Sequence, residues 1–512
     1  MGKSHTPHST TQRSKKKIRV GVLCAAATAP LAILIILYLV DVPIGQPDFL
    51  IYRYSPFVPL RVMRGLVALG LGAVGLLVIH RRFRRSETLG LGAGAVAGFC
   101  YLGLVVWSFF GPPISTRQHT FNMLSPSHDG AFMLESRHVT SVSAYVSTTF
   151  PERLKLEPEQ MRGRRVLSNP PGMTVLCALA RDLVATTSGL RTWLVSSFGL
   201  GELEDPSQRT EFAAALLVAI LMTMAWGVSV LLAWRLCRIW MPPPAALVVA
   251  FACVFNPASV CFTPGKDSAQ LLFVLAILLC WMLAFTKTRG RYGFAAGGLV
   301  AAATMVGLVH VWVFAIVAGA TLWHSFGTDR AWRGWLMACA IPAVAGGCVV
   351  ALISWVVWDW NIVTTAYRVG LRYGQVQLPI ITDPFYWTLV GLPMFLLFVG
   401  PLFWAQVVAV RGDVSDSTAA LGRRLLVTTV VVLVYVYFFA NNSETPRLWI
   451  PFVPMLLIGM ALRRELFRFD HAGHRTICVL LLALQLGVTV AHWSLMDVRE
   501  SEWRLSTGRM WE

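Results

Sequence analysis

Apolar runs of about 18 residues or more recur along this chain and constrain its fold more than any other feature. A run of that length lets a helix cross the hydrocarbon core of a bilayer. The composition agrees, because 56% of the 512 residues are hydrophobic and only 14% are charged. A typical soluble domain carries about 25% charged residues. The chain is therefore not a soluble enzyme, a disordered regulator or a small secreted scaffold.

The apolar runs predict about thirteen transmembrane helices, so the expected fold class is an all-α, polytopic helical bundle. The predicted spans are 20–40, 63–80, 88–110, 212–234, 243–262, 269–286, 292–309, 310–324, 336–358, 385–410, 425–440, 448–462 and 476–494. The stretch 292–324 reads either as two short helices that meet near His310 or as one long tilted helix.

Positive charge indicates which loops stay inside. The formal net charge is +18, and Lys and Arg concentrate in cytoplasmic loops of membrane proteins. With a cytoplasmic tail over 1–19 and two helices in 292–324, about 24 of the 44 Lys and Arg residues fall in inner loops. A single helix there would turn five arginines outward, so two helices are favoured: Arg423, Arg424, Arg463, Arg464 and Arg468. The charge excess is an orientation signal, and nucleic acid is not an expected partner.

The spans form one unit over 20–494, followed by a short outer tail over 495–512. Residues 111–211 make a large first outer loop. Within it, 131–150 predicts an amphipathic helix on the membrane surface, and a second helix is expected from Met173 onward.

The unusual polar motifs fall almost entirely on the predicted outer face. They are His128-Asp129-Gly130, Ser168-Asn169-Pro170-Pro171-Gly172, Pro264-Gly265-Lys266-Asp267 and Glu444-Thr445-Pro446-Arg447. Transporters usually carry ionisable residues or broken helices near the midplane. The one-sided pattern therefore favours a catalytic or binding site at the outer interface.

In the order and sidedness of these motifs the chain resembles the GT-C class of membrane glycosyltransferases, such as the dolichyl-phosphate-mannose-protein mannosyltransferases. The resemblance implies transfer of a sugar from a polyprenyl-phosphate donor to a glycan, lipid or protein acceptor, with inversion at the anomeric carbon. The chain departs from the class at Asn169, where members often have His. It also has no Asp-x-Asp pair in the outer loop, so neither a divalent metal nor another cofactor is indicated.

Such a transfer needs a general base for the acceptor hydroxyl, and a carboxylate can serve. Asp129 is the first candidate, with a helix N-cap as the equally weighted structural alternative. Glu135 is the second candidate, and its alternative is a solvated residue on an amphipathic face.

The departing phosphate needs cations, and Arg can hold its oxygens bidentately. The candidates are Arg447, Lys266, Arg372 and Arg368. Their alternatives are ion pairs of Arg447 with Glu444 and of Lys266 with Asp267, and lipid head groups for the other two. We expect His128, Asn169, Pro170, Pro171, Gly172, Asp267, Glu444 and Trp449 to shape the site, Trp449 by stacking on a sugar ring. Arg162, Arg164 and Arg165 are expected to form a lipid-surface patch.

The sequence thus predicts a transferase of the plasma (inner) membrane, with its N-terminus in the cytoplasm and its site on the periplasmic or extracytoplasmic face. Membrane lipid and the lipid-linked sugar are the expected partners. Two other functions stay open: a transporter or flippase of lipid-linked glycans, and a glycan polymerase or ligase.

Overall fold

The computed structural model describes residues 20–42, 44–46, 50–54, several positions between 59 and 74, 129–156, 164–197, 206–326, 331–377, 384–409, 416–439, 445–468 and 472–497. Some predictions lie outside the described residues. They are the tail 1–19, the span 88–110, most of the span 63–80, nearly all of the tail 495–512, and the site residues His128 and Glu444.

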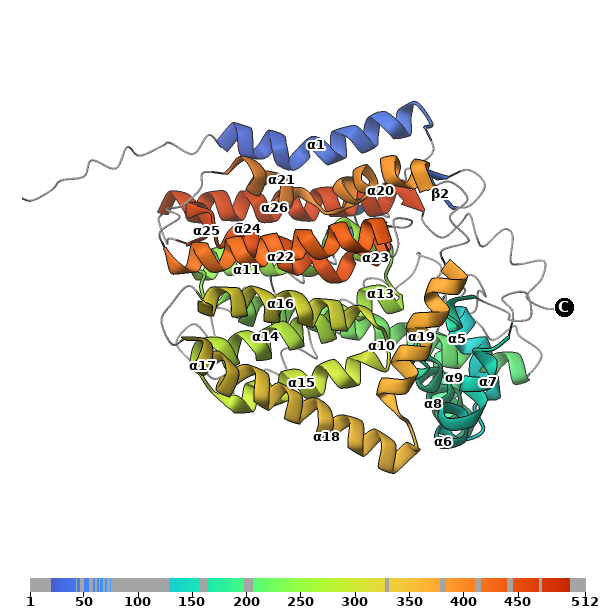
Figure 1. Cartoon of the computed structure of the whole chain (residues 1–512). Coiled ribbons are helices and arrows are strands. Elements are labelled where there is room, and N and C mark those ends of the chain that lie inside the picture. The colour runs from blue at the N-terminus through green and yellow to red at the C-terminus, as the bar shows by residue number, and fades with distance from the viewer. Residues whose placement is uncertain are drawn as a thin grey trace, which may run out of the picture.

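Long apolar helices run side by side and form the body of the molecule (Figure 1). They are α1 (Val20–Leu39), α10 (Pro206–Cys237), α14 (Leu271–Lys287), α16 (Val309–Phe326), α18 (Ile341–Trp358), α22 (Ser417–Phe439) and α26 (Ala472–Leu495). The short helices of the first loop gather at one end of this bundle, on the right in Figure 1. The arrangement is that of a helical membrane protein, as the sequence predicts.

Among the described residues, seven helices are long and apolar enough to span a bilayer, or up to nine if two bent pairs each count as one span. The pairs are α8 (Gly172–Thr186) with α9 (Ser188–Ser197), bent by 101°, and α20 (Pro384–Phe398) with α21 (Pro401–Val408), bent by 96°. Thirteen spans are not confirmed. One reason is α11 (Pro243–Val254), which has 12 residues and at 1.5 Å per residue reaches only about 18 Å.

The remaining helices are short or pack beside the long ones. They are α5 (Gly130–Glu135), α6 (Val142–Ala144), α7 (Phe150–Arg153), α12 (Pro257–Cys261), α13 (Lys266–Ala269), α15 (Gly290–Thr304), α17 (Ala331–Trp335), α19 (Ile362–Gln377), α23 (Thr445–Leu448), α24 (Val453–Ala461) and α25 (Glu465–Arg468). Three short strands form one antiparallel sheet: β1 (Ile44–Gln46), β2 (Leu50–Tyr54) and β3 (Met496–Asp497). Ile44 pairs with Tyr52, and Arg53 pairs with Asp497.

The ambiguous stretch 292–324 contains two helices, as predicted. Helix α15 ends at Thr304 and α16 begins at Val309, so the break lies just before His310. The break also receives the proline turn of the first loop, because the Gly172 N–H donates to the Met305 carbonyl at 2.8 Å. A Cβ at Gly172 would lie 2.4 Å from that carbonyl oxygen, so only glycine fits here.

The expected single helix over 131–150 is wrong. Helix α5 and a 3₁₀ turn (Ser136–His138) end at Val139, whose backbone is extended, and α6 begins only at Val142. A π-helical turn (Tyr145–Thr149) then leads into α7. The apolar positions Phe132, Val139 and Val146 are nevertheless all buried. The segment folds into a compact cap whose apolar side chains pack inward, instead of lying flat on lipid.

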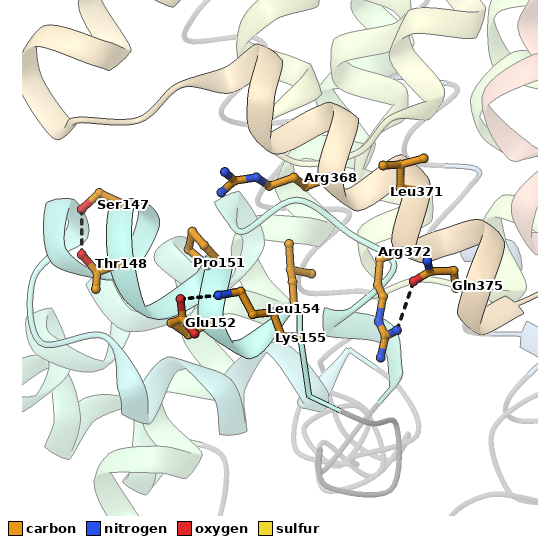
Figure 2. Close-up of a pocket in the computed structure, with 10 residues that line it drawn as sticks. All are labelled: Ser147, Thr148, Pro151, Glu152, Leu154, Lys155, Arg368, Leu371, Arg372 and Gln375. Carbon is orange, nitrogen blue, oxygen red and sulfur yellow. Dashed lines mark hydrogen bonds and ion pairs between the residues drawn. The ribbon is translucent and has the colours of Figure 1, made fainter.

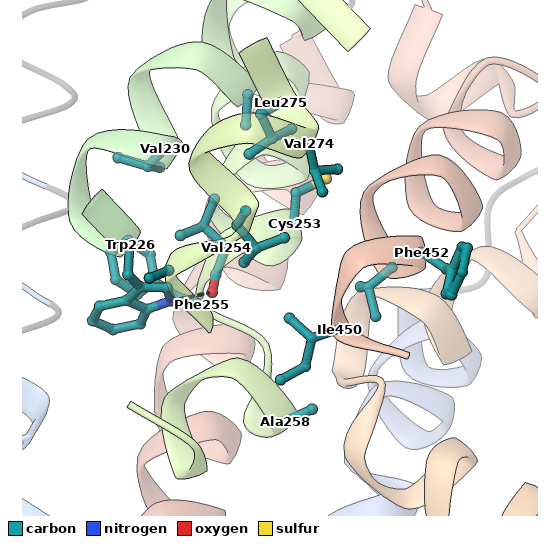
Figure 3. Packing of buried hydrophobic residues seen from close by; sticks show 14 of the residues in the cluster. Trp226, Val230, Cys253, Val254, Phe255, Ala258, Val274, Leu275, Ile450 and Phe452 are labelled. Atoms are coloured by element: carbon teal, nitrogen blue, oxygen red, sulfur yellow. Dashed lines mark hydrogen bonds between the residues drawn. The ribbon is translucent and has the colours of Figure 1, made fainter. Parts of the chain in front are cut away.

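A buried core joins the middle helices (Figure 3). Trp226 of α10 is fully buried and donates from its indole nitrogen to the Val254 carbonyl at 3.1 Å. Its ring meets Phe255 edge-on with centroids 4.7 Å apart. Because an indole N–H needs an acceptor when it is buried, this bond fixes α10 against the end of α11.

Candidate functional site

Asp129 stands before α5 but does not cap it. Its side chain makes no cap hydrogen bond, and it is only 5% exposed. One carboxylate oxygen is 2.7 Å from Nη1 of Arg165, and the other accepts the backbone N–H of Lys266 at 2.5 Å. The N-cap alternative is therefore wrong, and the carboxylate is directed toward residues far away in the sequence.

Arg165 connects two carboxylates. Its second terminal nitrogen, Nη2, lies 3.0 Å from Oδ2 of Asp267, while Nη1 holds Asp129. The same Asp267 oxygen is 3.4 Å from Nε of Arg447, and the other oxygen accepts from the Gln270 amide at 3.2 Å. One guanidinium thus bridges the first loop to the start of α13, and α23 brings a second guanidinium to the same place.

The proline turn is tied to this group through Asn169. The Lys266 ammonium donates to Oδ1 of Asn169, and Nδ2 of Asn169 donates to the Arg165 carbonyl at 2.7 Å. Lys266 also lies over the Phe132 ring, 5.5 Å from its centroid. At the position where members of the GT-C class often have His, this chain has Asn169. Its side-chain oxygen accepts one hydrogen bond and its side-chain nitrogen donates another.

Gly265 allows Asp129 to approach α13. A Cβ there would lie 2.6 Å from the Phe262 carbonyl oxygen and 3.4 Å from Oδ2 of Asp129. The first distance is shorter than any real Cβ contact, so the Pro-Gly-Lys-Asp motif needs glycine at this point. The bare backbone lets the Lys266 N–H face the carboxylate directly.

We call Asp129, Arg165, Asn169, Lys266, Asp267 and Arg447 the polar cluster. Three cationic side chains face two carboxylates, which leaves one formal positive charge. The Arg165 and Arg447 side chains are each 15% exposed and that of Asp267 is 12% exposed, so the cluster is largely shielded from solvent but not sealed. Charge interactions are stronger in such a place than in water.

Arg165 shows where the sequence interpretation was wrong. The residue does not belong to a lipid-surface patch, because its guanidinium is bound to two buried carboxylates. Gln270 was likewise not anticipated. The sequence shows only that Arg165 stands four residues before Asn169, close to the Pro-Pro-Gly motif, and this position does not reveal its two partners.

Glu135 belongs to a separate buried network. It is 4% exposed, so the solvated alternative is wrong. Its carboxylate pairs with Arg153 and accepts from the Tyr145 hydroxyl at 3.1 Å. Burial and the neighbouring Glu135 charge raise the pKa of the Tyr145 phenol well above its ordinary value. These contacts join α5 to α7. Of the two candidate bases, only Asp129 therefore belongs to the polar cluster.

Three further predicted residues make no contact that joins them to the polar cluster in the described structure. Trp449 is 4% exposed and packs edge-on against Phe395 and Tyr437, with centroids 4.9 and 5.6 Å away, so it does not offer a ring face to a sugar. Arg368 and Arg372 line a different pocket on α19. In the described part of the chain, no group of three or more His, Cys, Asp or Glu residues could hold a metal ion.

The loops predicted to be inner also meet one another. Arg468 pairs with Asp416, and the Arg464 Nη1 donates to the Ala409 carbonyl at 2.8 Å. Ser417 lies within hydrogen-bond distance of His324, at 3.2 Å. Residues predicted for opposite sides of the membrane thus form two separate groups of contacts. No family model matches the chain, and no curated protein matches it either.

Proposed function

We propose that this protein is a GT-C-like membrane glycosyltransferase that moves a sugar from a polyprenyl-phosphate donor to a glycan, lipid or protein acceptor. The observation that carries the proposal is the polar cluster. Four motifs dispersed along the chain contribute to it, from the first loop to the helix before α24. A carboxylate and several cations are the groups that such a transfer requires.

Asp129 is suited to the role of base. A carboxylate has about four lone-pair positions, and the two oxygens of Asp129 each accept one bond from the described protein. An acceptor hydroxyl can therefore bind without displacing Arg165. In the transfer, the acceptor oxygen bonds to the anomeric carbon, the bond from that carbon to the phosphate oxygen breaks, and Asp129 takes the hydroxyl proton.

Arg447, with Lys266 beside it, is suited to the departing phosphate. Negative charge develops on that phosphate as the sugar leaves, and preorganised cations stabilise it best where water is scarce. The formal excess of one positive charge in the cluster favours an anionic ligand over a neutral one. Asp267 orients Arg447 and Arg165 in this scheme.

The test is transfer in reconstituted vesicles supplied with a labelled polyprenyl-phosphate sugar. Asp129→Asn keeps the side-chain shape and an oxygen that can accept the Lys266 N–H, but it removes the base. We expect transfer to fall by about 10²- to 10⁴-fold, with membrane insertion intact. Asp182→Asn is the matched control, because that carboxylate is 65% exposed on α8 and lies outside the cluster. Wild-type rates in the Asp129 variant would overturn its role as base.

A further inference from the structure

Helix α19 lies at the end of a span. It begins at Ile362, and only residues 359–361 separate it from the end of α18 at Trp358. Trp355 and Trp358 are exposed on that last part of α18, and exposed tryptophans mark the interface between membrane and water. Figure 1 shows α19 running across the ends of the long helices. The helix is therefore placed at the level of the lipid head groups.

One side of α19 is apolar and uncovered in the described structure. Val363, Tyr367 and Leu371 follow one another at intervals of four residues and are 73%, 66% and 53% exposed. Residues spaced in this way share one face of a helix, while Ile362 and Val369 are buried against the protein. A polar helix with one apolar stripe at this depth is typical of an interfacial helix whose stripe faces lipid.

A pocket of about 520 Å³ separates α19 from the first loop (Figure 2). Its lining comes from the first loop, which includes Glu152 and Lys155, and from α19, which includes Arg368, Leu371 and Arg372. Arg368 and Arg372 project from α19, and Pro151, Leu154 and Lys155 face them from α7 and the turn after it. Among the described residues, three cations line the pocket against one carboxylate, so these side chains leave an excess of positive charge.

Arg368 is the open cation of this pocket. Lys155 pairs with Glu152 at 2.7 Å, and Arg372 donates to the Leu156 carbonyl at 2.6 Å and to Gln375 at 3.1 Å. Among the residues that the structure describes, Arg368 has no hydrogen-bond or ion-pair partner. An exposed arginine beside two further cations that already have partners is well placed to bind a phosphate bidentately.

We propose that this pocket binds a phosphate carried on an apolar chain, with the phosphate at Arg368 and the chain along the stripe of Val363, Tyr367 and Leu371. Leu371 connects the two parts, because it both lines the pocket and belongs to the stripe. The pocket shares no residue with the polar cluster, so the site is additional to the proposed transfer site. A bilayer phospholipid and a polyprenyl phosphate both have this chemistry.

Native mass spectrometry of the full-length protein tests the proposal. The protein is mixed with phosphatidylglycerol, polyprenyl phosphate or inorganic phosphate, and the bound fraction is measured. We expect at least one of the two lipids to bind more tightly than inorganic phosphate. Arg368→Gln should weaken that binding about tenfold or more, because a charge-assisted hydrogen bond is lost. The lipid that the wild-type protein binds more tightly shows whether the ligand is a bilayer phospholipid or a polyprenyl phosphate.

Two further variants complete the design. Lys155→Gln alters the opposite wall at a residue whose side chain is 70% exposed, so it should weaken lipid binding without unfolding the protein. Arg289→Gln with Arg291→Gln removes two exposed arginines outside the pocket and should leave binding unchanged. Equal binding by wild type and Arg368→Gln, or inorganic phosphate binding as tightly as both lipids, would overturn the site. The bound fraction is measured without sugar transfer, so the result is independent of the proposed activity.

Discussion

At the scale of single residues, Arg165 holds the polar cluster together. Its guanidinium is the link between Asp129 and Asp267, whose side chains are 7% and 12% exposed. Removing one partner of a buried ion pair leaves the other charge without compensation, which costs far more than losing an exposed pair. The stability of this end of the molecule should therefore depend on Arg165.

We predict that Arg165→Gln lowers the free energy of unfolding by about 3 kcal/mol. Arg137→Gln is the comparison, because Arg137 pairs with Glu211 at the same distance of 2.7 Å but is 50% exposed. That variant should cost about 1 kcal/mol or less. Thermal unfolding of both purified variants in one detergent checks the pair. Equal losses would show that the Arg165 bridge is no stronger than a surface contact.

The sequence allowed several cluster residues to be predicted for a physical reason. Asp129, Lys266, Asp267 and Arg447 lie in polar motifs that all fall in predicted outer loops, and a site at that interface needs a carboxylate and cations. Arg165 could not be recognised in this way, because it follows other arginines in a polar loop where a lipid-facing patch is equally reasonable. Its partners are decided by tertiary structure, which no local pattern records.

At the scale of elements, contact between α15 and α18 depends on small residues. A Cβ on Gly297 would lie 1.8 Å from the Ala343 carbonyl oxygen, and one on Gly346 would lie 1.9 Å from that of Phe294. The two backbones therefore touch through their glycines, as is common between helices in membranes, where small residues allow close packing.

Gly346→Ala should push these two helices apart, whereas Gly347→Ala should not. A Cβ at Gly347 meets its nearest atom, the Gly297 carbonyl oxygen, at 3.6 Å, which is ordinary contact. We expect the first variant to lower the melting temperature by about 1–3 °C, in line with an overpacking cost of about 1–3 kcal/mol, and the second to leave it nearly unchanged. Equal melting temperatures for the two variants would show that the helices do not meet as closely as described.

Element boundaries were less predictable than element existence. Hydropathy identifies α10, α14, α18 and α26 because their apolar runs are long. It cannot distinguish α11, a buried helix of 12 residues, from a span, because both are apolar all round. The segment 131–150 has helical spacing throughout, yet the helix is interrupted at Val139, where the backbone is extended. The residues before this interruption pack against α8, a tertiary contact that the spacing does not reveal.

At the scale of the whole molecule, the two ends differ in character. The polar cluster and the α19 pocket lie at the end with the first loop. Elsewhere, Arg464, Arg468 and His324 contact Ala409, Asp416 and Ser417, respectively. The positive-inside rule predicts that the second group faces the cytoplasm. Which group faces which compartment stays a prediction.

Cysteine labelling tests this orientation. In a cysteine-free background, Asp182→Cys on α8 and Arg289→Cys after α14 each add one thiol at an exposed position. A membrane-impermeant maleimide added to intact cells stripped of their wall should label position 182, and position 289 only after lysis. The reverse labelling pattern would show that the orientation is opposite to the predicted one and that the polar cluster faces the cytoplasm.

The central claim is that one cluster holds both the base and the cation for the departing phosphate. Steady-state kinetics of Asp129→Asn and Arg447→Gln in the reconstituted transfer assay test it most directly. We predict that the first variant lowers kcat with little change in the donor KM. The second should raise the donor KM about tenfold or more, because a charge-assisted contact to phosphate is lost. Wild-type values of both constants in both variants would contradict the claim.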